Sequence, residues 1–185
     1  MIFINACMRD KDSRTLKLAR SIIRGQAAQE INLSEIEDLL PYTEKKNPTN
    51  SEIEKRFIHF AKKIADCDGL VIAAPFWDMS FPALLKVFLE KLSIRDVMFE
   101  DNGKTCSGIA KCPYMFFITT RGMYIPDDSD LEQATPYLKA LCQLWGIKKF
   151  DSVSAFNLDY LSEEEVEERL EKAVAEGKVK LNNLL

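Results

Sequence analysis

Histidine, paired cysteines and long apolar stretches are scarce or absent in this 185-residue chain. One histidine and five scattered cysteines without a Cys-x-x-Cys pair argue against a metal site and against a disulfide framework. No segment approaches the roughly 20 consecutive apolar residues that cross a bilayer. Lysine and arginine (25) are outnumbered by aspartate and glutamate (29), which excludes a broad basic surface for nucleic acid. We therefore expect a cytoplasmic protein with free thiols and with neither a membrane nor a nucleic-acid partner.

Glycine is missing from the first loop of the chain. This loop follows the apolar residues 2–6 and reads CMRDKDSRT. It therefore contains neither the Gly-x-x-x-x-Gly-Lys-[Ser/Thr] phosphate loop nor the Gly-x-Gly-x-x-Gly dinucleotide turn. No Ser-His-Asp or Cys-His arrangement is apparent either, because His59 falls within a predicted helix remote from the loops. We expect a structural role for His59.

Apolar runs and helical patterns alternate along the whole chain. Short apolar runs predict five strands, at residues 2–6, 30–33, 70–74, 114–118 and 150–156. Amphipathic spacing predicts five helices, at residues 14–24, 51–65, 82–92, 130–145 and 162–179. This alternation is typical of βαβ units. We expect one α/β domain over residues 1–185, with a parallel sheet and helices on both faces.

Three details of this pattern are less regular. Residues 41–50 are polar, carry two prolines and are predicted to form a loop. Residues 93–112 show no clear periodicity and are interpreted as an insertion after the third helix. Pro136 marks either the true start of the fourth helix or a kink within it.

Three loops follow strands one, three and four of the predicted sheet. They read CMRDKDSRT, PFWDMSFP and TTRGMY. Ligands of parallel sheets bind beyond the carboxyl ends of the strands. The three loops are therefore predicted to form one site.

The first of these loops leads into a helix with hydroxyl groups at its start. Ser13 and Thr15 would lie beside backbone N–H groups that have no partner within the helix and carry partial positive charge. Arg9 or Arg14 could add a cation, so a phosphate is the natural occupant. The competing interpretation is that Asp12 or Ser13 only caps the helix.

The second and third loops complete the predicted site. Phe76, Trp77 and Met79 follow a buried strand and suggest a flat aromatic ligand whose heteroatoms meet backbone amides. Packing of Phe76 and Trp77 under neighbouring helices is the competing interpretation. Thr120, Arg121 and Gly122 offer hydroxyl, cation and flexible backbone, although Gly122 is also compatible with an ordinary turn.

The segments SRTLKLA, VIAAPFWDMSFPALLK, ITTRGM and TPYLKALCQLWGI resemble the flavodoxin-like NAD(P)H-dependent oxidoreductases, the group that contains FMN-dependent azoreductases and NAD(P)H:quinone reductases. The resemblance runs from residue 2 to about residue 156. It implies a flavodoxin-like three-layer sandwich with strand order 2-1-3-4-5. It also implies a homodimer. The cofactor is expected to be FMN rather than FAD, because the chain is short.

The resemblance assigns the FMN contacts residue by residue. The phosphate would be held by Ser13, Arg14 and Thr15. The isoalloxazine ring would be bordered, largely through backbone groups, by Pro75, Phe76, Trp77, Asp78 and Met79. Its pyrimidine side would face Thr120, Arg121 and Gly122. In this interpretation the flavin carries the chemistry, and no side chain is assigned a catalytic role.

This chain departs from the family pattern at three places. Cys7 and Met8 stand where a serine or histidine is frequent, Asp78 replaces an asparagine, and Met123 replaces a glycine. The Asp78 carboxylate would disfavour the anionic reduced flavin and so lower its potential. The start of the helix could lower the pKa of the Cys7 thiol, although we favour Cys7 as a small packed residue.

The resemblance implies that hydride passes from NAD(P)H to the flavin and then to a quinone, an azo compound or a similar small aromatic acceptor. Two alternatives stay open. One is a flavodoxin-type electron carrier that binds FMN without oxidising NAD(P)H. The other is a non-enzymatic module that has kept the fold and lost the cofactor.

Overall fold

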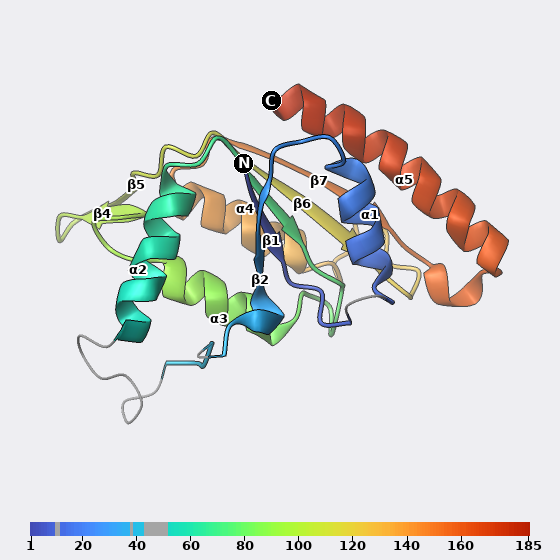
Figure 1. The fold of residues 1–185 in the computed structure, drawn as a ribbon, viewed down its shortest axis with the longest axis horizontal. Helices are drawn as coiled ribbons and strands as arrows, with labels where there is room; N and C mark the ends of the chain where they lie inside the picture. The colour runs from blue at the N-terminus through green and yellow to red at the C-terminus, as the bar shows by residue number, and fades with distance from the viewer. Residues whose placement is uncertain (10–11, 38, 43–51) are drawn as a thin grey trace.

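The computed structural model describes residues 1–9, 12–37, 39–42 and 52–185 (Figure 1). Most of the predicted loop 41–50 and the first residue of the predicted helix 51–65 lie outside these residues. Five parallel strands form the central sheet in the order β2-β1-β3-β6-β7. Their bounds are β1 (Ile2–Asn5), β2 (Gln29–Asn32), β3 (Leu70–Ala73), β6 (Tyr114–Thr120) and β7 (Lys149–Ala155). The predicted strand order 2-1-3-4-5 is confirmed.

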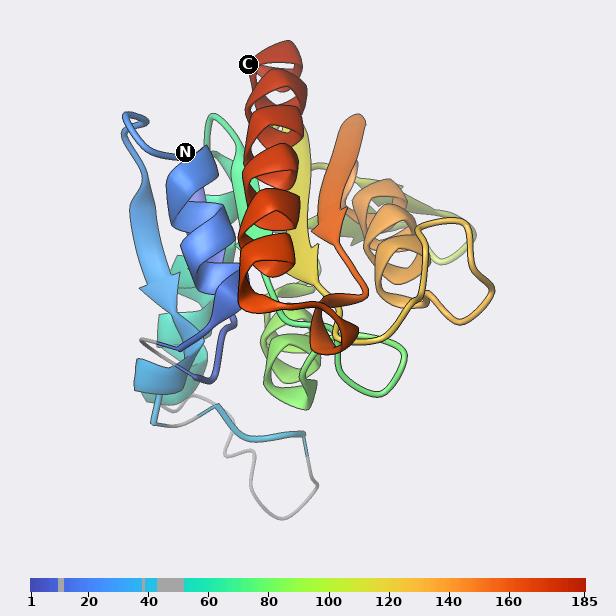
Figure 2. The same ribbon diagram turned by 90° about the vertical axis from the view of Figure 1, so that its right-hand side faces the viewer.

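Five α-helices cover the sheet on both faces. They are α1 (Arg14–Ile22), α2 (Glu52–Ala65), α3 (Ala83–Leu92), α4 (Ala134–Trp145) and α5 (Glu163–Leu184). Helices α1 and α5 pack side by side on one face, as Figure 2 shows, and helices α2, α3 and α4 pack on the other. The short 3-10 helices η1 (Leu33–Glu35) and η2 (Leu158–Tyr160) follow β2 and β7. None of the described helices could cross a bilayer.

Alternation along the central strands explains the two layers. In β3, Leu70 and Ile72 belong to the core under α2, α3 and α4, whereas Val71 belongs to the core under α1 and α5. In β6, Met115 and Phe116 divide between the two cores in the same way. Successive side chains of a strand point to opposite faces, so a strand buried on both faces is mainly apolar. The resulting apolar runs are the feature from which β3 and β6 were predicted.

Helix α1 ends at Ile22 rather than at residue 24, helix α4 begins later than predicted, and helix α5 ends later than predicted. Helix α4 begins at Ala134 rather than at residue 130, because the buried Glu132 carboxylate accepts the N–H groups of Ala134 and Thr135. Pro136 therefore lies in its first turn and marks a start, not a kink. Helix α5 extends to Leu184, beyond the predicted residue 179, and a capping box between Ser162 and Glu165 fixes its start.

The irregular segment 93–112 contains an antiparallel hairpin of β4 (Phe99–Asp101) and β5 (Cys106–Gly108). The hairpin docks on the end of α4, where Gly108 lies directly against the backbone of Gly146. A side chain at position 108 would collide with that backbone. Two glycines thus allow the insertion to pack closely on the main body.

Candidate functional site

A cavity of about 400 Å³ opens at the carboxyl edge of the sheet. This size falls within the range of small-molecule sites. Eight of the eleven residues predicted from the sequence line it: Ser13, Arg14, Thr15, Pro75, Phe76, Trp77, Thr120 and Gly122. The structure therefore brings all three predicted loops together. It adds four residues to the lining, namely Met8, Arg9, Asp12 and Asp159.

The start of α1 forms one wall of this cavity. Ser13 is the N-cap residue, and its Oγ accepts the N–H of Leu16 at 3.1 Å. The capping interpretation is therefore right for Ser13, but its hydroxyl hydrogen is left to donate elsewhere. Within the described residues, no partner accepts the backbone N–H groups of Arg14 and Thr15. The wall thus presents two free amide donors beside a hydroxyl, the arrangement that binds an anion at a helix start.

A hydroxyl–hydroxyl bond joins this wall to the third loop. Thr15 Oγ1 and Thr120 Oγ1 lie 2.6 Å apart, and both residues are buried. Whichever hydroxyl accepts this bond keeps its own hydrogen for another acceptor. The bond fixes the first turn of α1 against the end of β6 and adds a further donor beside the two free amides.

Cys7 is a packed residue and not a reactive thiol. Its side chain is buried, and Sγ lies 3.7 Å from the carbonyl oxygen of Ala73. Burial raises the pKa of the Cys7 thiol to about 11, and the nearby Ser13 hydroxyl offsets this only in part. The suggestion that the helix start lowers this pKa is therefore wrong.

The second loop is a tight turn. Trp77 and Ser80 exchange both backbone hydrogen bonds at 2.9 Å, and the residues between them, Asp78 and Met79, have φ of 48° and 65°. Positive φ at both central positions is the signature of a type I′ turn. The turn leaves the Trp77 side chain 41% exposed, so the interpretation of Trp77 as a core residue is wrong.

Hydrogen bonding within the turn limits which amides a ligand can use. Phe76 N–H donates to the Thr120 carbonyl at 3.1 Å, and Trp77 N–H donates to Ser80. Among the described residues, no acceptor is found for the N–H groups of Asp78 and Met79. The amides available in this loop are therefore those at the tip of the turn.

Three predicted side chains do not line the cavity. Asp78 lines a neighbouring cavity of about 430 Å³, and Met79 lines neither of the two. Arg121 is 1% exposed and points inward, where it donates to the Ile125 carbonyl and the Asp127 carboxylate at 2.6 Å each. The prediction that the Arg121 side chain faces the ligand is corrected: it braces the third loop from behind, 5.3 Å from the centre of the Phe76 ring.

Asp159 is a site residue that sequence reasoning missed. It lies in η2, after β7, whereas the predicted site includes only the loops after the first, third and fourth predicted strands. Its carboxylate pairs with Arg14 at 3.0 Å, and its N–H donates to the Gly122 carbonyl at 3.0 Å. The carboxylate lies so close to Gly122 that a side chain at position 122 would overlap it. Gly122 is needed for this close approach. Asp159 pairs with the Arg14 guanidinium, which could otherwise bind an anion in the cavity.

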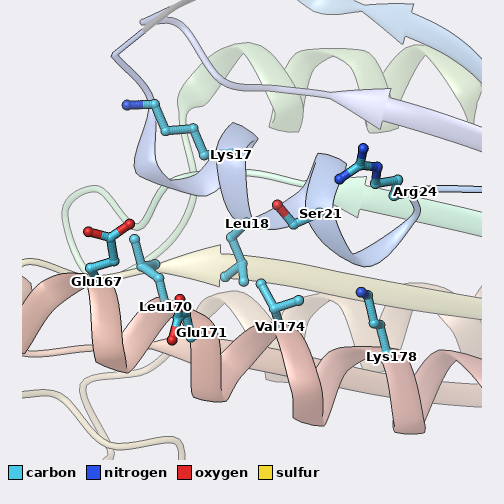
Figure 3. A pocket seen from close by; sticks show the side chains of 9 residues that line it. All are labelled: Lys17, Leu18, Ser21, Arg24, Glu167, Leu170, Glu171, Val174 and Lys178. Atoms are coloured by element: carbon cyan, nitrogen blue, oxygen red, sulfur yellow. The ribbon is translucent and has the colours of Figure 1, made fainter.

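A second cavity, of about 460 Å³, lies between α1 and α5 (Figure 3). Its apolar part is formed by Leu18, Leu170 and Val174, and charged side chains of both signs surround it, with Arg24 and Lys178 at one end. None of the residues predicted from the three loops lines it. We assign the candidate site to the first cavity because helix-start amides, buried hydroxyls and an exposed aromatic ring meet there.

Comparison with known proteins identifies the family. A family model described as "Flavodoxin-like fold" matches residues 1–181. The chain belongs to this flavodoxin-like family. An FMN-dependent NADH:quinone oxidoreductase of Clostridium perfringens is 33% identical over 124 residues, 65% of this chain and 62% of that protein. The one from Clostridium beijerinckii is 30% identical over 138 residues, 74% of this chain and 68% of that protein. The chain thus aligns with only about three fifths of the C. perfringens relative.

Solved structures give the same architecture for this flavodoxin-like chain. An FMN-dependent NADH-azoreductase from Bacillus anthracis, solved in complex with FMN, superimposes with a TM-score of 0.81 at 20% identity, covering 97% of both chains. At this identity the likeness shows the fold alone. It agrees with the order of the five central strands.

We expect the Met79→Gly substitution to stabilise the protein. A left-handed backbone is unfavourable for a residue with a Cβ, and glycine removes that penalty. The free energy of unfolding, measured with urea, should rise by about 0.5–1 kcal/mol. Met79→Ala is the control, because it also loses the side chain but keeps the Cβ. A glycine variant no more stable than the alanine variant would contradict the strained turn.

Proposed function

We propose that this chain is an FMN-dependent NAD(P)H oxidoreductase that acts on a quinone, an azo compound or a similar small aromatic acceptor. The observation that carries the proposal is the meeting of an anion-binding helix start with an exposed aromatic side chain, Trp77, in one cavity. The relatives from C. perfringens and C. beijerinckii are FMN-dependent NADH:quinone oxidoreductases, which supports the same cofactor and the same class of reaction.

The first wall of the cavity fits the phosphate of FMN. It supplies the backbone amides of Arg14 and Thr15, the hydroxyl of Ser13, whichever of the Thr15 and Thr120 hydroxyls accepts their mutual bond, and the cation of Arg9. Amide and hydroxyl donors at a helix start are the usual partners of a phosphate. Asp159 opposes an anion here, but its carboxylate is already paired with Arg14.

The opposite wall fits a flat ring. Pro75, Phe76 and Trp77 line it, and the free amides of Asp78 and Met79 lie at the tip of the same turn. Gly122 adds no side chain of its own to the lining. These residues would hold and orient the isoalloxazine ring and shield it from water. When bound, FMN would accept hydride from NAD(P)H and pass the electrons to the acceptor.

We further propose a cytoplasmic homodimer. All five cysteines are free, as expected in a reducing compartment. Trp77, which lines the cavity, is exposed, and so are Met123, Tyr124 and Tyr160, which follow the lining residues Gly122 and Asp159 in the sequence. Such a concentration is typical of an interaction surface.

The proposed function is tested by loading the purified chain with FMN and adding NADH, then NADPH, without oxygen. We expect the visible flavin absorbance to be lost with at least one of the two, and to return when a benzoquinone is added. Steady-state kinetics should follow a ping-pong pattern, because both substrates use one space. Bound FMN that stays oxidised with both donors would indicate an electron carrier. A chain that binds no FMN would indicate a non-enzymatic module.

We expect Asp159→Asn to bind FMN more tightly than the unchanged chain. The substitution removes a negative charge from the cavity and releases Arg14 toward the phosphate. Because this pair is exposed, we expect Kd to fall only about two- to tenfold in fluorescence titrations, and the effect to shrink in high salt.

The matched control for this prediction is Asp66→Asn. Asp66 forms an equally long ion pair, 3.0 Å with Lys111, and has the same side-chain exposure as Asp159, 62%. Neither Asp66 nor Lys111 lines the cavity. A Kd for the Asp159→Asn variant that equals that of the control would show that Asp159 does not oppose the phosphate.

A further inference from the structure

Two cysteines meet at the edge of the sheet opposite to the candidate site. Cys67 lies in the turn from α2 to β3, and Cys112 lies in the connection from β5 to β6. Their Sγ atoms are 3.4 Å apart. Both residues precede their strands, whereas the cavity lies beyond the carboxyl ends. The thiol pair is therefore separate from the proposed FMN site.

Backbone hydrogen bonds fix the segments that carry the two thiols. The N–H groups of Lys111 and Cys112 both donate to the carbonyl of Ala65, at 2.7 and 2.9 Å. The thiol of Cys67 contacts the Gly69 carbonyl at 3.2 Å, and that of Cys112 contacts the Tyr114 carbonyl at 3.2 Å. The short distance between the sulfur atoms is thus built into the fold.

The two thiols differ in reactivity. The hydrogen bond between the two thiols lowers the pKa of Cys67 against the effect of its burial, and the backbone of Gly69, the amino terminus and the backbone of Ile2 act in the same direction. The same bond, together with burial, raises the pKa of Cys112. Cys67 is also only half-buried, whereas Cys112 is buried. Cys67 is therefore the thiol that an oxidant reaches and the one that ionises first.

We propose that Cys67 and Cys112 form an oxidation site that closes to an intramolecular disulfide when the chain meets a hydroperoxide. The Cys67 thiolate attacks the terminal oxygen of the hydroperoxide and the O–O bond breaks. The other peroxide oxygen departs as an alkoxide, or as hydroxide from hydrogen peroxide, and Cys67 becomes a sulfenic acid. The Cys112 sulfur then attacks the Cys67 sulfur, the S–O bond breaks, and the S–S bond forms. The Cys112 proton leaves with the hydroxyl group as water. Two thiols lose two electrons, and one peroxide is reduced.

Only a small movement separates the thiols from a disulfide. The sulfur atoms must approach from 3.4 Å to about 2.05 Å. The bond would close a loop between residues 45 positions apart in the sequence and would reduce the entropy of the unfolded chain. We therefore expect oxidation to raise the stability of the fold and to leave FMN binding unchanged.

The test treats the full chain carrying Cys106→Ser with hydrogen peroxide. That substitution removes the one cysteine that the structure shows as exposed. We expect the intact mass to fall by two hydrogen atoms. After free thiols are then blocked, peptide mapping should find Cys67 linked to Cys112. A reducing agent should reverse the link. The link should also raise Tm by roughly 5–15 °C.

Two further variants distinguish the roles of the two thiols. In Cys112→Ser, peroxide should convert Cys67 to a sulfenic acid that a cyclic dione traps. In Cys67→Ser, Cys112 should remain a thiol, as the buried Cys142 does. The proposal is overturned if peroxide only adds oxygen to Cys67 of the Cys106→Ser chain, or if Cys67 reacts no faster than Cys142. The peptide map of that chain decides the question even if a variant fails to fold.

Discussion

The hydrogen bond between Thr15 and Thr120 ties the start of α1 to the end of β6, and the candidate site depends on it. A parallel sheet brings the loops after β1, β3 and β6 to one edge, but it does not fix their depth or orientation. The bond between the two buried hydroxyls does so at 2.6 Å. It holds the first turn of α1, with Arg14 and Thr15, at the cavity that Trp77 also lines. Anion-binding and ring-binding walls thus form one cavity.

The sequence predicted the centre of the sheet well because the strands β1, β3 and β6 are buried on both faces. Residues 70–73 and 114–118 form continuous apolar runs because both faces of these strands are buried. Such runs are typical of the central strands of a parallel sheet. The eight lining residues found in advance all lie within the predicted loops. The rest depended on tertiary contacts. Arg121 turns inward because the third loop offers it the Ile125 carbonyl and the Asp127 carboxylate, partners that no periodicity reveals.

Backbone conformation and long-range proximity account for the remaining errors. Met79 adopts a left-handed conformation that its residue type disfavours. The sequence Asp78-Met79 therefore lacks the glycine that usually indicates a type I′ turn. Asp159 reaches Arg14 across 145 positions of the sequence. The Asp159 carboxylate can lie beside residue 122 only because that residue is glycine. In the sequence, this glycine is equally compatible with an ordinary turn. Such pairs become visible only when the chain is folded.

The phosphate-binding role of the α1 start is tested most directly by comparing FMN with riboflavin, which lacks the phosphate. We expect FMN to bind far more tightly to the unchanged chain. We expect the Ser13→Ala/Thr15→Ala double variant to lose about 1–3 kcal/mol of that preference. Ser162→Ala, which removes the cap of α5 remote from the cavity, should keep it in full. Equal binding of FMN and riboflavin, or an unchanged preference in the double variant, would contradict the phosphate-binding role of this helix start.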